Sequence, residues 1–302
     1  MKRTLITLLL VNLVLSSCGS VSTRTPLALA TPTSTPRLIN TSASALLAST
    51  PSDPKIFIPL VEKSYRTLSQ IVSWQIQYTG KIDISLDVNV FNLDLFDTPA
   101  GVIDTLRQRG VFVMCYFSAG SYEDWRPDSS HFPPEVLGND MEGWPGEKWL
   151  DIRRLDLLAP TMEARLDLAV QKGCDGVDPD NVNGYTNRTG FPLTYNDQIT
   201  YNIFLSQAAH SRNLAIGLKN DLEQVPDLLR YFDWALNEEC FAYQECDRLL
   251  PFTQSGKPVF VIEYKLQPQE FCQQANQIGF NALHKNRELD AYRTDCRRFS
   301  SP

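Results

Sequence analysis

From about residue 73 onward, short runs of apolar and β-branched residues alternate with longer segments whose apolar residues recur at helical spacing. The short runs predict strands and the longer segments predict helices. Strands are expected at 73–78, 84–90, 111–117, 176–180, 214–219, 234–238, 259–264 and, by a weaker pattern, 280–283. Helices are expected at 99–109, 161–172, 194–212, 222–231 and 267–278.

This alternation is typical of an α/β fold with a parallel sheet. Eight strands in about 250 residues fit a single (β/α)8 TIM-type barrel better than an open doubly wound sheet, which is the alternative. The first strand is not followed by Gly-x-Gly-x-x-Gly, and the chain has no phosphate loop ending in Gly-Lys-Ser/Thr. Nucleotide binding therefore has no support. We expect residues 56–302 to form one barrel domain.

The N-terminal segment follows a different pattern. Lys2 and Arg3 precede an apolar run at 5–15, which is typical of a secretory signal and too short to predict a membrane span. The run ends in Leu-Ser-Ser-Cys at 15–18, which resembles the lipobox of bacterial lipoproteins. We expect a signal peptide at 1–17 and a lipid on Cys18. The alternative is an ordinary signal peptide with an incidental cysteine.

Residues 18–55 are rich in Ser, Thr, Ala and Pro and show no sustained apolar period. Such a composition buries too little surface to offset the entropy of ordering, so the segment is predicted to be a tether. The protein is then expected in the bacterial cell envelope, held to the membrane through the lipid on Cys18 alone. If the cysteine is incidental, it is secreted.

The 302 residues carry a net charge of −7, but residues 56–302 hold 23 basic and 34 acidic side chains, a net charge near −11. This acidity argues against a nucleic-acid partner and favours a neutral or cationic one.

The six cysteines that follow Cys18 fit an exported, disulfide-bonded domain, although six cysteines allow fifteen connectivities. Proximity in the sequence favours Cys240–Cys246 and Cys272–Cys296, which leaves Cys115–Cys174. The cysteines lack zinc-finger spacing and the chain has three scattered His residues, so no metal site is predicted.

The carboxyl ends of the predicted strands are unusually polar, and barrel active sites are built at these ends. Turn and helix-cap chemistry explains an Asp or Asn at any one end, but not their repetition at several. The candidate site residues at or near these ends are Tyr116, Asp178, Asp180, Asn181, Tyr185, Lys219, Asn220, Glu238, Glu239 and Glu263.

Strand alternation places Asp178 and Asp180 on one side of their strand, and either Glu238 or Glu239 points inward from another. Two carboxylates that project from different strands over a cleft are what glycoside hydrolysis requires. Serine hydrolase chemistry is not supported, because the chain has no Gly-x-Ser-x-Gly elbow. No cofactor is expected.

Several segments in this region resemble glycoside hydrolase family 114, whose founding activity is endo-α-1,4-polygalactosaminidase. They are Trp-Pro-Gly-Glu-Lys-Trp at 144–149, Cys-Asp-Gly-Val-Asp-Pro-Asp-Asn-Val-Asn-Gly-Tyr at 174–185, Gly-Leu-Lys-Asn at 217–220, Leu-Asn-Glu-Glu-Cys-Phe at 236–241 and Lys-Pro-Val-Phe at 257–260. The resemblance spans about 73–264. It implies a monomeric barrel glycosidase that cuts an α-1,4-linked galactosamine polysaccharide internally.

The resemblance assigns Asp180 as the nucleophile and Glu238 as the acid/base of a retaining reaction. Asp178 is expected to keep Glu238 protonated by like-charge repulsion. Glu239 stands where the family usually has Gln. The alternatives are a barrel glycosidase with another polysaccharide substrate, and a non-catalytic lipoprotein that binds polysaccharide.

Aromatic residues near the carboxylates are candidates for sugar stacking. Trp144 lies in the long segment at 120–157, and we expect it to line subsites together with Tyr116 and Tyr185. The alternative is that these rings pack the segment onto the barrel. Lys219 is expected to be a buried partner of the carboxylates, because an isolated ammonium inside a barrel is costly.

Overall fold

The computed structural model describes residues 65–299. The predicted signal peptide at 1–17, the lipid site at Cys18 and the tether at 18–55 lie outside these residues. Within them, no helix has the length and apolar character needed to span a membrane.

The main sheet has eight parallel strands whose spatial order follows the sequence, plus one short antiparallel strand at its end. The parallel strands are β1 (Trp74–Gln77), β2 (Val90–Asp94), β3 (Phe112–Ser118), β7 (Gly176–Asp180), β8 (Ala215–Lys219), β9 (Trp234–Glu238), β10 (Val259–Glu263) and β11 (Asn281–His284), and β12 (Thr294–Asp295) pairs with β11.

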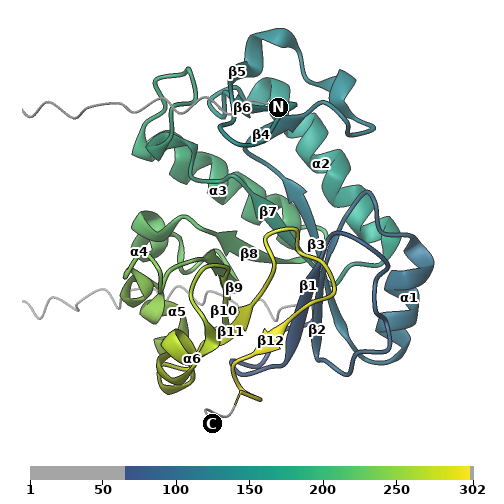
Figure 1. Ribbon diagram of the computed structural model, residues 1–302. Coiled ribbons are helices and arrows are strands. Elements are labelled where there is room, and N and C mark those ends of the chain that lie inside the picture. Colours follow the sequence, from purple (N-terminus) through teal and green to yellow (C-terminus); the bar gives the residue numbers. More distant parts are fainter. Residues whose placement is uncertain (1–64, 300–302) are drawn as a thin grey trace, which may run out of the picture. The chain divides into compact units, whose positions relative to one another are not determined.

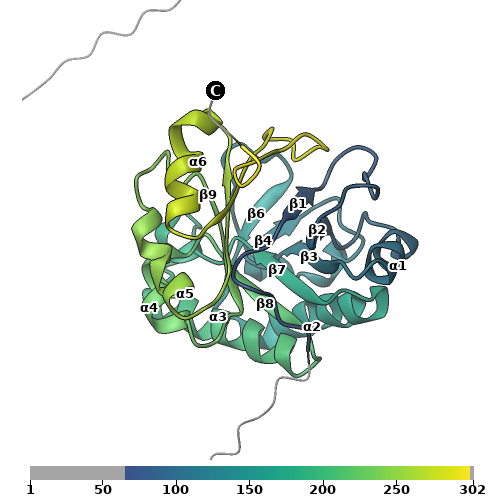
Figure 2. The ribbon, with the colours of Figure 1, turned by 90° about the horizontal axis from the view of Figure 1, so that it is seen from below.

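The sheet is curled, so that its first and last parallel strands approach each other (Figure 2). The indole Nε1 of Trp74 on β1 donates to the carbonyl oxygen of Asn281 on β11 at 2.9 Å. Side chains on the concave side form an apolar cluster that includes Trp74, Phe112 and Trp234. This arrangement is consistent with the expected TIM-type barrel.

Helices follow most strands and surround the sheet (Figure 1). A second apolar cluster fills the space between them and the convex side of the sheet. The α-helices are α1 (Ala100–Gln108), α2 (Leu155–Lys172), α3 (Tyr195–His210), α4 (Val225–Leu228), α5 (Leu250–Gln254) and α6 (Pro268–Gln277). Short 3-10 helices are η1 (Ser129–His131), η2 (Pro134–Val136), η3 (Gly184–Thr186), η4 (Leu222–Gln224) and η5 (Cys246–Leu249).

Three of the sequence-based elements differ from the structure. The second strand is β2 at Val90–Asp94 and not 84–90, because all five residues of β2 are buried, polar Asn92 and Asp94 included, whereas the alternating segment before it is only half-buried. Helix α2 begins at Leu155 and not at 161, so it contains Pro160; because proline inside a helix removes a backbone hydrogen bond and disfavours the preceding turn, the sequence predicts a start after it. The helix expected at 222–231 is divided into η4 and α4.

The long segment at 120–157 contains a three-stranded antiparallel sheet that the sequence did not predict. Its strands are β4 (Ser121–Glu123), β5 (Leu137–Asp140) and β6 (Glu147–Leu150), with β6 in the centre. The carbonyl oxygen of Gly120 accepts the Leu150 N–H at 3.0 Å, which joins this small sheet to the end of β3. It therefore lies directly beside the carboxyl ends of β3 and β7 (Figure 1).

The two disulfides favoured by sequence proximity and the remaining Cys115–Cys174 pair are all present. They join Cys115 to Cys174, Cys240 to Cys246, and Cys272 to Cys296. The first ties β3 to the turn before β7, and the second closes the loop that follows β9.

Candidate functional site

Three successive strands end in a polar side chain, and each is followed at once by a left-handed residue. Asp180, Lys219 and Glu238 end β7, β8 and β9, and the residues after them, Asn181, Asn220 and Glu239, have φ of 62°, 55° and 62°. Left-handed backbone turns the chain sharply at a cost that few residue types other than Gly accept easily. In each of the three strands, the chain therefore turns away from the sheet directly after the polar residue that ends the strand.

Lys219 lies between the two carboxylates. Its Nζ is 3.1 Å from Oδ2 of Asp180 and 3.2 Å from Oε2 of Glu238. The lysine side chain is 4% exposed, whereas those of Asp180 and Glu238 are 19% and 28% exposed. The two carboxylate oxygens can therefore be at most about 6.3 Å apart, the sum of the two contacts. A buried cation thus holds two partly accessible carboxylates close together.

Glu238 is held by neighbours on both sides. Asn220 donates from Nδ2 to Oε2 of Glu238 at 2.9 Å and accepts the Glu238 backbone N–H at 2.8 Å. The hydroxyl of Tyr264 donates to Oε1 at 2.5 Å. Both oxygens of this carboxylate are therefore fixed in position.

These contacts decide the charge of Glu238. Burial favours the neutral carboxyl, but the charge of Lys219 and the hydrogen bonds from Tyr264, Asn220 and Lys219 outweigh it and lower the pKa of Glu238 to about 2. Burial also disfavours the charged form of Lys219, but the carboxylates of Asp180, Glu238 and Asp178 raise the pKa of its ammonium above the ordinary value. The free site thus holds an ionised Glu238 beside a charged lysine.

Asp178 lies below this pair on the concave side of β7 and is fully buried. Its Oδ2 accepts from Nδ2 of Asn92 at 2.8 Å, and Oδ1 has no hydrogen-bond partner among the described residues. Burial raises the pKa of Asp178 to about 6, against the opposing charge of Lys219. In the free site the carboxyl with the raised pKa is therefore Asp178. Repulsion from Asp178 does not keep Glu238 protonated, contrary to the expectation from the sequence.

Asp180 is fixed through its backbone and both oxygens. The backbone N–H of Asn181 donates to Oδ1 at 2.8 Å, while Lys219 contacts Oδ2. The backbone N–H groups of Ala119 and Gly120 donate to the Asp180 carbonyl at 2.9 and 3.1 Å. A Cβ on Gly120 would lie 1.7 Å from the Asn181 carbonyl oxygen, so only Gly allows this approach.

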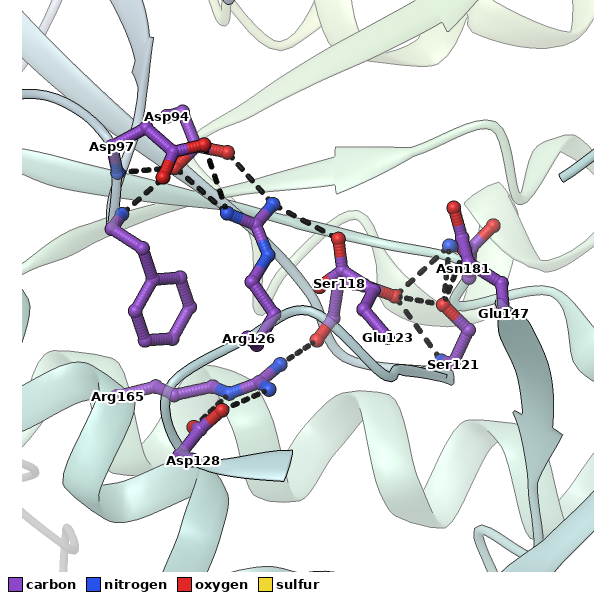
Figure 3. A network of polar contacts seen from close by, with 11 residues as sticks. Asp94, Asp97, Ser118, Ser121, Glu123, Arg126, Asp128, Glu147, Arg165 and Asn181 are labelled. Atoms are coloured by element: carbon purple, nitrogen blue, oxygen red, sulfur yellow. Dashed lines mark hydrogen bonds and ion pairs between the residues drawn. The ribbon is translucent and has the colours of Figure 1, made fainter. Parts of the chain in front are cut away.

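The side chain of Asn181 continues into a polar network (Figure 3). Its Nδ2 donates to the hydroxyls of Ser118 and Ser121 at 2.9 and 3.2 Å. Ser121 in turn donates to Oε2 of Glu147 on β6 at 2.9 Å. The small sheet is thereby joined to the strand that carries Asp180.

A tryptophan forms part of the floor on the concave side. A Cβ on Gly217 would lie 2.0 Å from Nε1 of Trp234, and one on Gly176 would lie 2.7 Å from Cη2 of the same ring. The two glycines leave the space that this indole fills. Trp234 is therefore packed below the level of Lys219.

The predicted aromatic residues lie in different places. Tyr116 is beside the lysine, with Nζ of Lys219 6.0 Å from its ring centroid, and it packs on Tyr78 with a ring separation of 4.5 Å. Tyr185 is on the loop after β7, where its hydroxyl donates to Glu223 at 3.2 Å. Trp144 is 48% exposed in the turn between β5 and β6. Tyr116 is thus joined to the site, whereas no recorded contact links the other two to its carboxylates.

Two predicted carboxylates lie apart from the pair. Glu239 pairs with Lys265 at 3.0 Å. Glu263 is on the convex side of β10 and accepts the Phe241 N–H at 2.8 Å, so it holds the loop after β9. Because alternate residues of a strand point to opposite sides, Tyr264 rather than Glu263 reaches Glu238. The same alternation in the sequence could have identified Tyr264.

Within residues 65–299, no group of three or more His, Cys, Asp or Glu side chains is arranged to hold a metal ion. The chemistry of the described site is that of two carboxylates around a lysine, with a tyrosine hydroxyl on one of them. Such a set can attack an electrophilic carbon and exchange a proton with a leaving group or water.

The model of glycoside-hydrolase family GH114 matches residues 59–301. The crystal structure of Aspergillus fumigatus Ega3 in complex with galactosamine is 41% identical, with a TM-score of 0.73, and the match covers 77% of this chain and 100% of that one. The glycoside hydrolase domain of PelA from Pseudomonas aeruginosa shares the fold at 12% identity, with a TM-score of 0.59 and coverage of 74% and 97%. An uncharacterized protein of Deinococcus radiodurans is 25% identical, covering 78% of this chain and 88% of its own length.

Proposed function

Because the chain belongs to glycoside-hydrolase family GH114, we propose that it hydrolyses an α-1,4-linked galactosamine-containing polysaccharide at internal bonds. The observation that carries this proposal is the pair of partly exposed carboxylates, Asp180 and Glu238, around the buried Lys219. The choice of sugar is supported by the similarity to Ega3, which was crystallised with galactosamine.

In the proposed reaction Asp180 attacks the anomeric carbon while Glu238 gives a proton to the leaving glycosidic oxygen. The bond between carbon and leaving oxygen breaks as the bond to Asp180 forms. Water then attacks the same carbon, gives a proton to Glu238 and releases Asp180. Such a retaining route needs carboxyl groups about 5–5.5 Å apart, whereas an inverting route needs about 6.5–9.5 Å. The bridging by Lys219 keeps the two nearest oxygens within about 6.3 Å of each other, which is compatible with the retaining route.

Glu238 is ionised in the free site, so it must gain a proton before it can act as the acid. We infer that proton uptake accompanies substrate binding. A sugar bound over the site excludes water and strengthens the repulsion between carboxylates, both of which favour the neutral form of Glu238.

The acidity of residues 56–302 suits a cationic substrate. A partly deacetylated galactosamine polymer carries ammonium groups, which a negatively charged surface attracts. Added salt screens this attraction and shortens its range. The proposed location is the bacterial cell envelope, with the lipid on Cys18 as the anchor. That part of the proposal rests on the sequence alone.

Incubation of the full-length protein with partly deacetylated poly-α-1,4-galactosamine tests the activity, with chitosan and a neutral glucan in parallel and product lengths read by mass spectrometry. Short oligomers from the galactosamine polymer alone are expected. Cleavage of the neutral glucan alone would contradict the proposed substrate but would leave the proposed mechanism intact. Binding of the polymer without any product would favour a non-catalytic polysaccharide-binding protein.

A further inference from the structure

Glu147 is a buried carboxylate that the proposed reaction does not use. It lies on β6 directly opposite Glu123 of β4, and it is 7% exposed. Glu123 pairs with Arg126 at 2.9 Å. By contrast, in the contacts described for residues 65–299, the Glu147 carboxylate meets one side chain, the hydroxyl of Ser121.

That contact sets the direction of the neighbouring hydrogen bonds. Ser121 gives its hydroxyl proton to Glu147, so in the 2.5 Å contact between the two serines Ser118 is the donor. Each serine oxygen then accepts two further hydrogens. Ser118 accepts from the Ser121 N–H and from Nδ2 of Asn181, and Ser121 accepts from Ser118 and from the same Nδ2. Both serine hydroxyl hydrogens therefore have an acceptor.

The end of the network is the Asp180 carboxylate. Nδ2 of Asn181 contacts both serine oxygens, which helps to hold this residue in its left-handed backbone conformation. Its backbone N–H then meets Oδ1 of Asp180 at 2.8 Å. A change in the acceptors of Asn181 is therefore transmitted to Asp180.

We propose that Glu147, acting through Ser121 and Asn181, is a positioning residue that aligns the Asp180 carboxylate with the anomeric carbon. The proposal rests on the role of Asp180 in the proposed function. Its essential feature is an acceptor oxygen at position 147 and not the charge of the side chain, because the Ser121 hydroxyl needs only an acceptor.

The charges around Glu147 are unfavourable for a purely structural role. Burial and the charges of Glu123 and Asp180 together raise the pKa of Glu147 to about 7, although the Ser121 hydrogen bond and the charge of Arg126 act to lower it. The opposite Glu123 also has a buried Oε2 without a hydrogen-bond partner in the described part of the chain. An amide at position 147 could accept from Ser121 through oxygen and offer its N–H groups to that oxygen.

Two substitutions separate the acceptor from the charge. Glu147→Leu removes the acceptor and is expected to lower kcat on the galactosamine polymer at least about tenfold, with KM changed less than about threefold, because misalignment slows reaction more than binding. Glu147→Gln keeps the acceptor and is expected to restore kcat to within about threefold of the wild type. Ser121→Ala removes the donor and should match the leucine variant. Glu142→Gln, at an exposed acid in the turn between β5 and β6, is the control for loss of charge.

Wild-type kcat in both Glu147→Leu and Ser121→Ala would overturn the proposal. So would a glutamine variant as slow as the leucine variant, since the acceptor would then not be the essential feature. A folding defect is recognised from the melting temperature, and in that case Ser121→Ala decides.

A crystal structure of Glu147→Leu gives a result that does not depend on activity. Asn181 still bonded to Asp180 and both serines would overturn the positioning role, whereas a displaced Asn181 would support it. If the wild type cleaves nothing, the proposed function fails and this structure still decides the role of Glu147. If the wild type cleaves and Asp180→Asn remains fully active, the assignment of the nucleophile fails instead.

Discussion

Gly120 and Asn181 approach so closely that a Cβ on the glycine would lie 1.7 Å from the Asn181 carbonyl oxygen. Two loops from different strands therefore meet backbone to backbone behind Asp180. Because backbone atoms rather than a flexible side chain form this contact, neither loop can give way without moving the other.

We expect Gly120→Ala to displace Asn181 and Asp180. Overpacking of this kind costs about 1–3 kcal/mol of unfolding free energy, and kcat should fall with it. Gly101→Ala is the matched control, because the Cβ at that position in α1 meets no atom within 4 Å and alanine favours a helix. Equal stability and activity of the two variants would contradict the close contact.

Asp180→Asn and Glu238→Gln test the proposed reaction. Removal of a general acid lowers kcat by about 10²–10⁴-fold, and loss of the nucleophile should cost at least as much. The measurement is the rate of product formation from the galactosamine polymer. Glu239→Gln is the control, since Glu239 pairs with Lys265 outside the carboxylate pair. Near wild-type rates in either test variant would remove that residue from the mechanism.

Lys219→Met should reduce stability in a pH-dependent manner. The folded pKa of Glu238, about 2, is below its ordinary value of 4.5, so the pairing stabilises the fold above about pH 4.5 and is lost as the pH falls toward 2. Loss of one partner of a fully buried pair costs about 3–5 kcal/mol, and about 1–3 kcal/mol is expected here because both carboxylates are partly exposed. Urea unfolding should show this deficit at pH 7 and a smaller one at pH 4. A deficit that is the same at both values would contradict the role of Lys219.

Substrate binding should take up a proton. Glu238 is ionised in the free site at neutral pH and must be neutral to act as the acid, so uptake should approach one proton for each bound oligomer. Calorimetry of galactosamine oligomer binding at pH 7, in buffers of different ionisation enthalpy, measures this number. Asp180→Asn should bind without turnover and keep the uptake, whereas Glu238→Gln should lose it. No uptake by Asp180→Asn would mean that Glu238 is not protonated in the complex.

Much of the main sheet could be predicted because short runs rich in apolar and β-branched residues alternate with helical segments along the chain. The runs at Gly176–Asp180 and Trp234–Glu238 have the same bounds in the sequence prediction and in the structure. Strand alternation also placed Asp178 and Asp180 on one side. The predicted position of the second strand was wrong because an alternating, half-buried segment at 84–90 precedes the buried strand and has the pattern of a strand itself.

The parts of the site that the sequence did not predict depend on contacts between distant segments. Glu147 meets Ser121 only because the unpredicted small sheet brings 147 beside β3, and no local pattern carries that information. The alternation of side chains along β10 places Tyr264 toward Glu238 and Glu263 on the opposite side, but the type of residue alone favours the carboxylate Glu263 as a site residue. The low pKa of Glu238 depends on the position of one buried lysine from another strand.

The left-handed residues after Asp180, Lys219 and Glu238 also bear on how this enzyme can diversify. Each of these three side chains belongs to the last residue of a strand, and the chain leaves the strand at the next residue. Loops beyond these points can gain, lose or exchange residues over evolutionary time while the three side chains stay in place. If these residues form the proposed reactive centre, new polysaccharide specificities should arise in the loops after β7, β8 and β9.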